Sequence, residues 1–543
     1  MSTLLVSNVQ FDAVGTNKIY YDGANLNVTS ANVNITGRLT ANAVYCPLYY
    51  DSSNTSFYID PAANSVIHNL RVTQMGLNNI TYVSKNGTNS MMLVINGRVF
   101  TTSGTSATWA NHTTGRGATG TSAVFGMNSF RAVNFPGETG TLTKAGVYGS
   151  SAYALFSTGN LYTWGYNGYG QLGAGDTTNR VVPFLSQVGV TNVFDHPSQS
   201  DVDTYYGRLF IKKTDNYIYA AGYNGYGQLG DTTVTQRNSF YQLTGLGTTV
   251  TNVWPIGAQY GFTFFQKADN SIWACGYNGY GNLGNGGTVN QSTPVDVTTA
   301  WGGVTGSARV IKKIIGGAAY HNGSGVSAQC WAIMLLDDNT TTYLRSAGAN
   351  NWGTIGNGAV AAANITTPIT PTVGAGRIST ISGGGGSPGT VMCLMANGDM
   401  YNWGYNAYGQ LGNGTTTDNG TPTLRASAVT GIYYDYTEYV QSYVSATFYK
   451  KADGLYSSGY NGYGQLGVGD TTQRTSFTRV LLPGDFTVAD LGSFHSTYPV
   501  ATYLAVGTDG RMYAWGYNAQ QNVTAETTTN CLAPIQITLP LGA

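Results

Sequence analysis

A nine-residue stretch, GYNGYGQLG, recurs along the chain and constrains its fold more than any other feature. The copies and variants are Gly165–Gly173, Gly222–Gly230, Gly276–Gly284, Gly348–Gly356, Gly404–Gly412 and Gly459–Gly467. Their leading glycines, followed by Gly516 of a partial copy, are separated by 57, 54, 72, 56, 55 and 57 residues. Spacing this regular means that one supersecondary unit is reused.

Each unit begins with a hairpin that ends on the leading glycine. RLFIKK-TDN-YIYAAG and FTFFQKADN-SIWACG alternate apolar residues around Asp-Asn, a pair that accepts positive φ, so we expect primed hairpin turns. A polar loop and another short strand follow, as in VVPFLSQV. About four short antiparallel strands without helical periodicity predict a β-propeller blade, and therefore an all-β protein.

The number of blades follows from the number of units. The hairpin MMLVINGRVFTTSG (Met91–Gly104) precedes the others and ends 61 residues before Gly165. Seven intervals thus run from Gly104 to Gly516, and we expect an N-terminal hairpin piece and the C-terminal tail to form one further blade together. Such closure would hide the sheet edges. The count favours eight blades, and a seven-bladed propeller is the alternative if one terminal piece packs elsewhere.

These repeats resemble those of the RCC1 family of β-propellers, in which W-G-x-N-x-x-G-Q-L-G follows such a hairpin. The resemblance extends from about Asn79 to the end of the chain. The family's G-x-x-H element occurs at Gly492–His495, and Tyr260 replaces the histidine in Gly257–Tyr260. Members typically have seven blades, so eight would be a departure. The family's namesake acts in guanine-nucleotide exchange and docks on chromatin, but no exchange residue transfers individually to this sequence.

The nonapeptide is first of all structural. Gly168–Gly173 satisfies G-x-G-x-x-G, but no helix follows to receive a pyrophosphate, so a dinucleotide site is excluded. We expect its glycines to allow close backbone approach between blades, and Asn167 and its copies to bond local backbone. Leucines are expected to fill the slots between blades: Leu172, Leu229, Leu283, Leu411 and Leu466.

The tyrosines of the nonapeptide are the candidate receptor-binding residues. Tyrosine offers an apolar face and a hydroxyl with only two χ angles to order, which suits recognition of sugars or protein surfaces. The alternative is that each tyrosine packs on the adjacent blade and was copied by repeat duplication. The candidates are Tyr166, Tyr169, Tyr223, Tyr226, Tyr277, Tyr280, Tyr405, Tyr408, Tyr460 and Tyr463.

The N-terminal segment differs from the repeats. Leu26–Val44 alternates apolar and polar residues, which predicts strands that need partner chains to bury one face. Residues within Tyr49–Val72 resemble the Y-D-x-x-N-T-x-Y-Y-x-D-P element of bacteriophage tail fibres and adhesins, particularly those of phages that infect cyanobacteria and marine bacteria. The matching residues are Tyr50, Asp51, Asn54, Thr55, Phe57, Tyr58, Asp60 and Pro61.

The resemblance implies a domain organisation and partners. Residues 1–37 would attach to other virion tail proteins and oligomerise, 38–75 would form a fibre-like neck, and 76–543 would form the propeller. Such fibres are usually homotrimers with a C-terminal host-recognition head. The N-terminus lacks a signal peptide, which fits a virion protein assembled in the host cytoplasm.

Charge and motif content exclude several functions. The 25 basic residues balance 25 acidic ones, which argues against nucleic-acid binding, and no stretch reaches membrane-span length. The lysine pairs, such as Lys212-Lys213 and Lys450-Lys451, occupy equivalent strand ends rather than one basic patch. Five dispersed cysteines without a CxxC pair and five dispersed histidines indicate neither a metal site nor a catalytic centre. We therefore predict a protein without cofactor or enzymatic activity.

The sequence thus predicts a virion tail fibre or adhesin whose RCC1-like propeller binds a glycan or protein receptor on the host cell. Three alternatives remain: a structural virion component without receptor binding, a cytoplasmic RCC1-like scaffold or exchange factor, and a glycan-degrading tailspike. Carboxylates lie mostly in turns, and no acid pair stands out for glycoside cleavage.

Overall fold

The computed structural model describes residues 18–21, 26–29, 80–83, 90–103, 131–148, 150–195, 206–257, 259–318, 329–360, 363–384, 389–434, 446–495, 501–519, 523–524 and 527–537. The chain divides into two compact units, Met1–Gly76 and Leu77–Ala543. In the first unit, β1 (Lys18–Tyr21) and β2 (Leu26–Thr29) form an antiparallel hairpin. The phage-like element Tyr50–Pro61 lies outside the described residues, so the stalk, the neck and their boundary stay predictions.

The second unit contains eight sheets of four antiparallel strands. Blade 1 consists of β3 (Ile80–Val83), β4 (Ser90–Ile95), β5 (Arg98–Ser103) and β6 (Arg131–Ala132). Blade 2 consists of β7 (Leu142–Tyr148), β8 (Ser151–Phe156), β9 (Leu161–Gly165) and β10 (Arg180–Gln187). Blade 3 consists of β11 (Val190–Phe194), β12 (Arg208–Lys213), β13 (Ile218–Gly222) and β14 (Arg237–Gln242). Blade 4 consists of β15 (Val250–Ile256), β16 (Phe262–Lys267), β17 (Ile272–Gly276) and β18 (Gln291–Asp296).

The second half of the unit repeats this plan. Blade 5 consists of β19 (Val310–Ala318), β20 (Cys330–Asp337), β21 (Thr342–Gly348) and β22 (Ile365–Ile369). Blade 6 consists of β23 (Ile378–Gly384), β24 (Thr390–Met395), β25 (Met400–Gly404) and β26 (Asn419–Ala426). Blade 7 consists of β27 (Gly431–Tyr434), β28 (Ala446–Lys451), β29 (Gly454–Gly459) and β30 (Arg474–Arg479). Blade 8 consists of β31 (Val488–His495), β32 (Ala501–Gly507), β33 (Met512–Gly516) and β34 (Cys531–Ile537).

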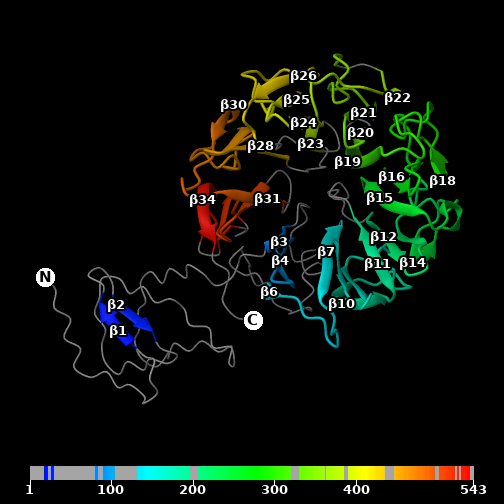
Figure 1. Ribbon diagram of the computed structural model, residues 1–543, viewed down its shortest axis with the longest axis horizontal. Helices are drawn as coiled ribbons and strands as arrows, with labels where there is room; N and C mark the ends of the chain where they lie inside the picture. Colours follow the sequence, from blue (N-terminus) through cyan, green and yellow to red (C-terminus); the bar gives the residue numbers. More distant parts are fainter. Residues whose placement is uncertain are drawn as a thin grey trace. The chain divides into compact units, whose positions relative to one another are not determined.

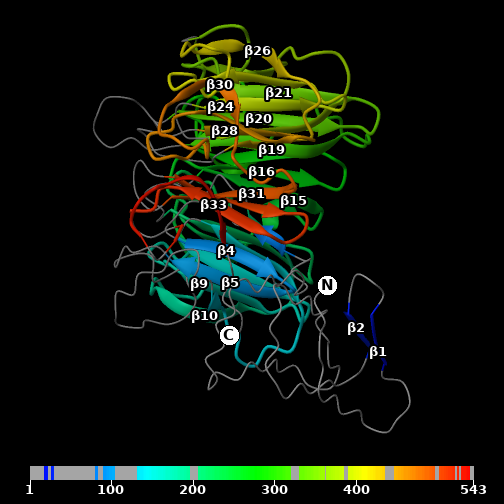
Figure 2. The same ribbon diagram turned by 90° about the vertical axis from the view of Figure 1, so that its left-hand side faces the viewer.

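The eight blades form a ring, which confirms the predicted β-propeller and the count of eight. Figure 1 shows the first strand of each blade, such as β7 or β19, nearest the centre and the fourth, such as β10 or β22, on the outside. Edge-on, strands such as β19, β20 and β21 run along the ring axis (Figure 2). Connections between strands one and two and between strands three and four therefore share one face, the loop face. The turns between strands two and three lie on the opposite hairpin face.

The expected blade built from both chain ends is wrong. Every sheet takes its four strands from one continuous stretch, because blade 1 and blade 8 each have their own fourth strand, β6 and β34. The ring closes by side-chain packing instead. Leu93 and Ile95 of β4 pack with Leu504 of blade 8, while Met92 and Val94 pack with blade 2. Alternate residues of one strand thus contact the two neighbouring blades.

The predicted two-residue primed turn occurs at Asn96 and Gly97, whose φ values are 51° and 72°. It is wrong for other hairpins. After β12, only Asn216 is left-handed (φ 67°), and its N–H donates to the Lys213 carbonyl at 2.9 Å. This is a three-residue loop closed by one left-handed residue. The Asp215 carboxylate uses its oxygen to accept the Tyr217 N–H at 3.1 Å, which stabilises the longer loop.

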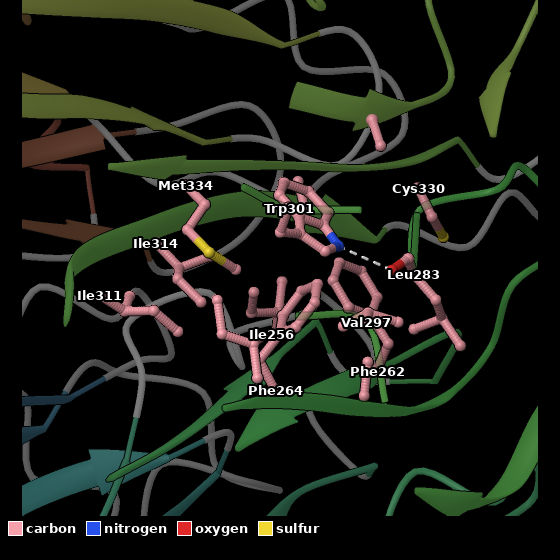
Figure 3. Packing of buried hydrophobic residues seen from close by; sticks show 14 of the residues in the cluster. Ile256, Phe262, Phe264, Leu283, Val297, Trp301, Ile311, Ile314, Cys330 and Met334 are labelled. Atoms are coloured by element: carbon pink, nitrogen blue, oxygen red, sulfur yellow. Dashed lines mark hydrogen bonds between the residues drawn. The ribbon is translucent and has the colours of Figure 1, made fainter. Parts of the chain in front are cut away.

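Apolar side chains from neighbouring blades form the core between them. Figure 3 shows Phe262 and Phe264 of blade 4 packed with Ile314 and Met334 of blade 5. Trp301, in the connection between the two blades, is fully buried and donates its indole N–H to the Leu283 carbonyl at 2.8 Å. All five predicted leucines are fully buried, which confirms that they fill core positions: Leu172, Leu229, Leu283, Leu411 and Leu466.

The glycine at the sixth position of each nonapeptide lies against the next blade. Gly281 has a φ of +77°, and a Cβ there would lie 2.6 Å from the Thr366 Cα in β22. Just beyond it, the Gly286 N–H donates to the Thr366 carbonyl at 3.0 Å. The predicted close approach between blades is therefore confirmed, and only glycine permits it. Equivalent glycines contact the fourth strand of the following blade at Gly170, Gly227, Gly353, Gly409 and Gly464.

We expect Gly281→Ala to lower the free energy of unfolding by roughly 2–4 kcal/mol, because the methyl group overlaps backbone and the residue is left-handed. Gly245→Ala is the matched control, since a Cβ at Gly245 meets nothing within 4 Å. Its effect should stay below about 1 kcal/mol. Urea denaturation followed by tryptophan fluorescence measures both variants, and equal stabilities would contradict the close approach.

Candidate functional site

A buried asparagine fixes the shape of each nonapeptide loop. In blade 3, Asn224 is fully buried, and its Oδ1 accepts the Leu229 N–H at 2.9 Å. Its Nδ2 donates to the Asp231 carboxylate at 2.8 Å and to the Thr233 and Thr235 carbonyls at 3.1 Å. The expected bonding to local backbone is therefore confirmed, and it reaches further than one turn. The same acceptor bond recurs at Asn167, Asn278, Asn350, Asn406, Asn461 and Asn518.

With the loops fixed, the tyrosines lie in register on the loop face. All ten predicted tyrosines are partly exposed, and rings of neighbouring blades contact each other. Centroid distances are 5.2 Å for Tyr169–Tyr223, 5.2 Å for Tyr226–Tyr277 and 5.6 Å for Tyr408–Tyr460. The same tyrosine side chains thus pack on the adjacent blade and remain partly exposed to solvent. Whether these tyrosines bind a receptor stays a prediction.

Four aromatic residues outside the predicted set join these rings. Tyr206 and Tyr260 lie two residues before the second strands β12 and β16, Trp352 lies 6.2 Å from Tyr405, and Tyr517 lies 5.6 Å from Tyr463. We call the ten predicted tyrosines and these four residues the tyrosine belt. Trp352 and Tyr517 stand in the degenerate repeats. Tyr206 and Tyr260 each precede a leading glycine by 16 residues, a periodic signal in the sequence that could have revealed them.

The belt contains two equivalent clusters of three rings, which we call the aromatic triads. At the junction of blades 2 and 3, Tyr169 stacks on Tyr206 with centroids 4.9 Å apart and planes 28° apart. Tyr223 meets both rings edge-on, at 5.2 and 4.6 Å. At the next junction, Tyr226 stacks on Tyr260 at 5.0 Å and 26°.

Tyr277 completes the second triad by meeting Tyr226 edge-on at 5.2 Å and Tyr260 at 4.9 Å. Stacked and edge-on contacts at these distances are favourable arrangements of aromatic quadrupoles. Burial, reinforced by neighbouring phenols, raises the pKa of Tyr223 to about 12 and also raises the pKa of Tyr277. Both phenols are therefore neutral under physiological conditions.

The nonapeptide loops that carry most of the belt are uncharged. The nonapeptides contain no charged residue, and in three of the adjoining loops an arginine pairs with an aspartate. Arg180 contacts Asp176 at 2.6 Å, and Arg237 contacts Asp231 at 2.5 Å. On the hairpin face, Lys212 donates to the Val250 carbonyl of the next blade at 2.9 Å. This lysine therefore joins two blades rather than contributing to a basic surface.

The described residues show no arrangement typical of catalysis. Within them, no group of three or more His, Cys, Asp and Glu side chains could hold a metal ion. Burial raises the pKa of the Cys275 thiol, and raises that of Cys393 to about 12, so neither is a thiolate at neutral pH. A helix long and apolar enough to span a membrane is likewise not found among the residues described. What the loop face offers is an uncharged aromatic surface suited to binding.

Comparisons with known proteins place this propeller in a class. The "Regulator of chromosome condensation (RCC1) repeat" model matches residues 158–195, 269–318 and 397–430. Together with the eight four-stranded sheets, these matches define an all-β, RCC1-like β-propeller. The predicted resemblance to RCC1 repeats is confirmed, and these matches do not test the resemblance to phage fibres.

Two curated relatives illustrate the range of this similarity. The ultraviolet-B receptor UVR8 of Arabidopsis thaliana is 26% identical over 58% of this chain, which spans 64% of the receptor. The X-linked retinitis pigmentosa GTPase regulator of Canis lupus familiaris is 28% identical over 27% of this chain, which spans 14% of that protein.

Solved structures are similar at lower identity. Human WBSCR16 has a TM-score of 0.46 and 15% identity, covering 68% of this chain and 90% of its own. Prp20p of Saccharomyces cerevisiae has a TM-score of 0.44 and 14% identity, covering 70% of this chain and 86% of its own.

Asp418 provides a pH-dependent test of how the loops are held. Its Oδ1 accepts the Asn406 N–H at 2.8 Å, and burial raises the pKa of this carboxyl above its usual value. A raised pKa favours the folded state below the unfolded value of about 3.9, and this advantage is lost as the pH rises through the folded value. We therefore expect Asp418→Asn, which keeps the acceptor without the charge, to raise the urea midpoint at pH 7 but not at pH 3.

Asp176→Asn is the matched control of opposite sign. A hydrogen bond from Arg180 lowers the pKa of Asp176, so its charged form stabilises the fold above the unfolded pKa. This variant should lower the midpoint at pH 7, and its effect should shrink as the pH falls below about 4. Shifts in the same direction for both variants would contradict the assignment.

Proposed function

We propose that this chain is a tail fibre or related adhesin of a bacteriophage, and that its propeller binds the host cell surface through the loop face. The tyrosine belt carries the proposal: partly exposed aromatic rings recur at successive blade junctions, most of them on nonapeptides without a charged residue. Tyrosine and tryptophan supply large contact areas at low entropic cost, which suits recognition surfaces. The fibre-like residues within Tyr49–Val72 support the link to a virion.

The N-terminal unit would supply attachment and valency. Residues 1–37 would bind other tail proteins and 38–75 would form the neck, with three chains assembled in the host cytoplasm. A trimer presents three identical loop faces, so weak single contacts add up to firm attachment through avidity. The receptor is a glycan or a protein of the host surface, and the chain needs no cofactor for this role.

A regulatory propeller is the second candidate. One relative is a GTPase regulator, and the structure of Prp20p was described together with its binding to Gsp1p and histones. A structural virion component without receptor binding is a further alternative. The three functions differ in what the purified chain binds, so binding assays separate them.

We expect the full chain to be a trimer by light scattering, and a chain that begins at Leu77 to be a monomer. Fluorescently labelled full chain should decorate intact cells from a panel of cyanobacteria and marine bacteria, and the shorter chain should decorate the same strains more weakly. The reason is the loss of avidity, which is worth at least about tenfold in apparent affinity.

Other outcomes distinguish the alternatives. A full-length monomer that captures a small GTPase would overturn the fibre proposal in favour of a regulator. A trimer that leaves every strain unlabelled would favour the structural virion component. Release of reducing ends from host polysaccharide would point to a tailspike instead.

A further inference from the structure

We infer that the two aromatic triads form a tandem site for a neutral polysaccharide, with one triad for each of two sugar units of the same chain. The inference rests on the proposed host-binding function and identifies its ligand class. It concerns two adjacent junctions, between blades 2 and 3 and between blades 3 and 4, rather than the whole tyrosine belt.

Among the described residues, the geometry distinguishes these two junctions. Each triad has a stacked pair, Tyr169–Tyr206 or Tyr226–Tyr260, with a third ring edge-on. At the junctions of blades 6 and 7 and of blades 7 and 8, the described rings that meet across the junction do so edge-on, Tyr408–Tyr460 at 5.6 Å and Tyr463–Tyr517 at 5.6 Å. The sequence explains this difference. The position equivalent to Tyr206 lies two residues before the residue that pairs with the leading glycine. In blades 5 to 8 this position is occupied by Gln329, Pro388, Val444 and Val500.

The structural role of the belt does not require the third ring. Blades 6 and 7 use the same glycine contacts, and blades 6 to 8 the same buried asparagine, without it. Tyr206 and Tyr260 are both partly exposed, so each adds an aromatic surface at the edge of the loop face. An aromatic residue at the same position in two adjacent blades, where the fold does not need it, indicates a ligand.

The chemistry of the triads fits a sugar. The faces of a pyranose carry C–H groups of slight positive charge, which complement the negative face of an aromatic ring. The phenols of Tyr223 and Tyr277 remain neutral, and the nonapeptides carry no charge, so an acidic polymer finds no counter-charge here. A neutral, hydroxyl-rich chain loses least on leaving water for such a surface.

Repetition of the site suits a repeating ligand. The two triads are joined by one nonapeptide, since Tyr223 belongs to the first and Tyr226 to the second. A polysaccharide that engages one triad holds its next units close to the other, which raises the effective concentration for the second contact. Long chains should therefore bind much more tightly than short oligosaccharides of the same sugar.

Affinity electrophoresis of the full chain tests this inference. The gels contain dextran, yeast mannan or laminarin as neutral polysaccharides, or alginate as an acidic one. We expect at least one neutral polymer to retard the chain. Tyr206→Ala or Tyr260→Ala should each weaken that retardation at least about tenfold, and the double variant should abolish it. Tyr217→Ala is the matched control, a partly exposed tyrosine in the turn between β12 and β13 and outside the tyrosine belt, and should bind as the unaltered chain does.

Tyr206→Phe keeps the ring and should retain binding, and urea midpoints show whether each variant is folded. Retardation by alginate alone, or equal losses in Tyr206→Ala and Tyr217→Ala, would overturn the inference. If no neutral polymer retards the chain while labelled chain still decorates host cells, the glycan ligand is wrong and the adhesin proposal survives. If no cells are decorated either, the adhesin proposal fails as well.

Discussion

The ring depends on the close approach of each nonapeptide loop to the fourth strand of the next blade. At Gly281 the backbone comes so near Thr366 that no side chain fits, and a backbone hydrogen bond from Gly286 continues the contact. The approach requires a loop of fixed shape, and the buried asparagine provides it from inside. Desolvated amide groups without partners would be costly, so full hydrogen bonding of this asparagine also specifies a single loop conformation.

This constraint explains why the tyrosines are so regular. Once each loop is held by the same bonds, residues at the same repeat position lie at the same height on the ring, and rings of adjacent blades meet. The belt is thus a consequence of the scaffold, and a binding surface can arise from it by small additions. Tyr206 and Tyr260 are such additions, since they convert ring pairs into triads at two adjacent junctions.

Several features were predictable from the sequence because they are local and periodic. The count of eight follows from the spacing of the hairpins, and the roles of glycine, leucine and asparagine follow from repetition. The expected composite blade was wrong because the short β6 and the degenerate repeat of blade 8 conceal complete blades. The turn type was wrong because Asp215 accepts a backbone N–H, which stabilises a three-residue loop that residue identities alone do not distinguish from a tighter one.

The sequence by itself determined the strand content, the repeat unit and the uncharged character of the loops, because these depend on residue type and on intervals within one unit. Only the tertiary structure decided which rings meet. Tyr169 and Tyr206 belong to different blades, and their stacking at 4.9 Å depends on how two sheets are rotated and spaced around the ring. That rotation is set by the packing between blades, and it acts between residues that no local pattern connects.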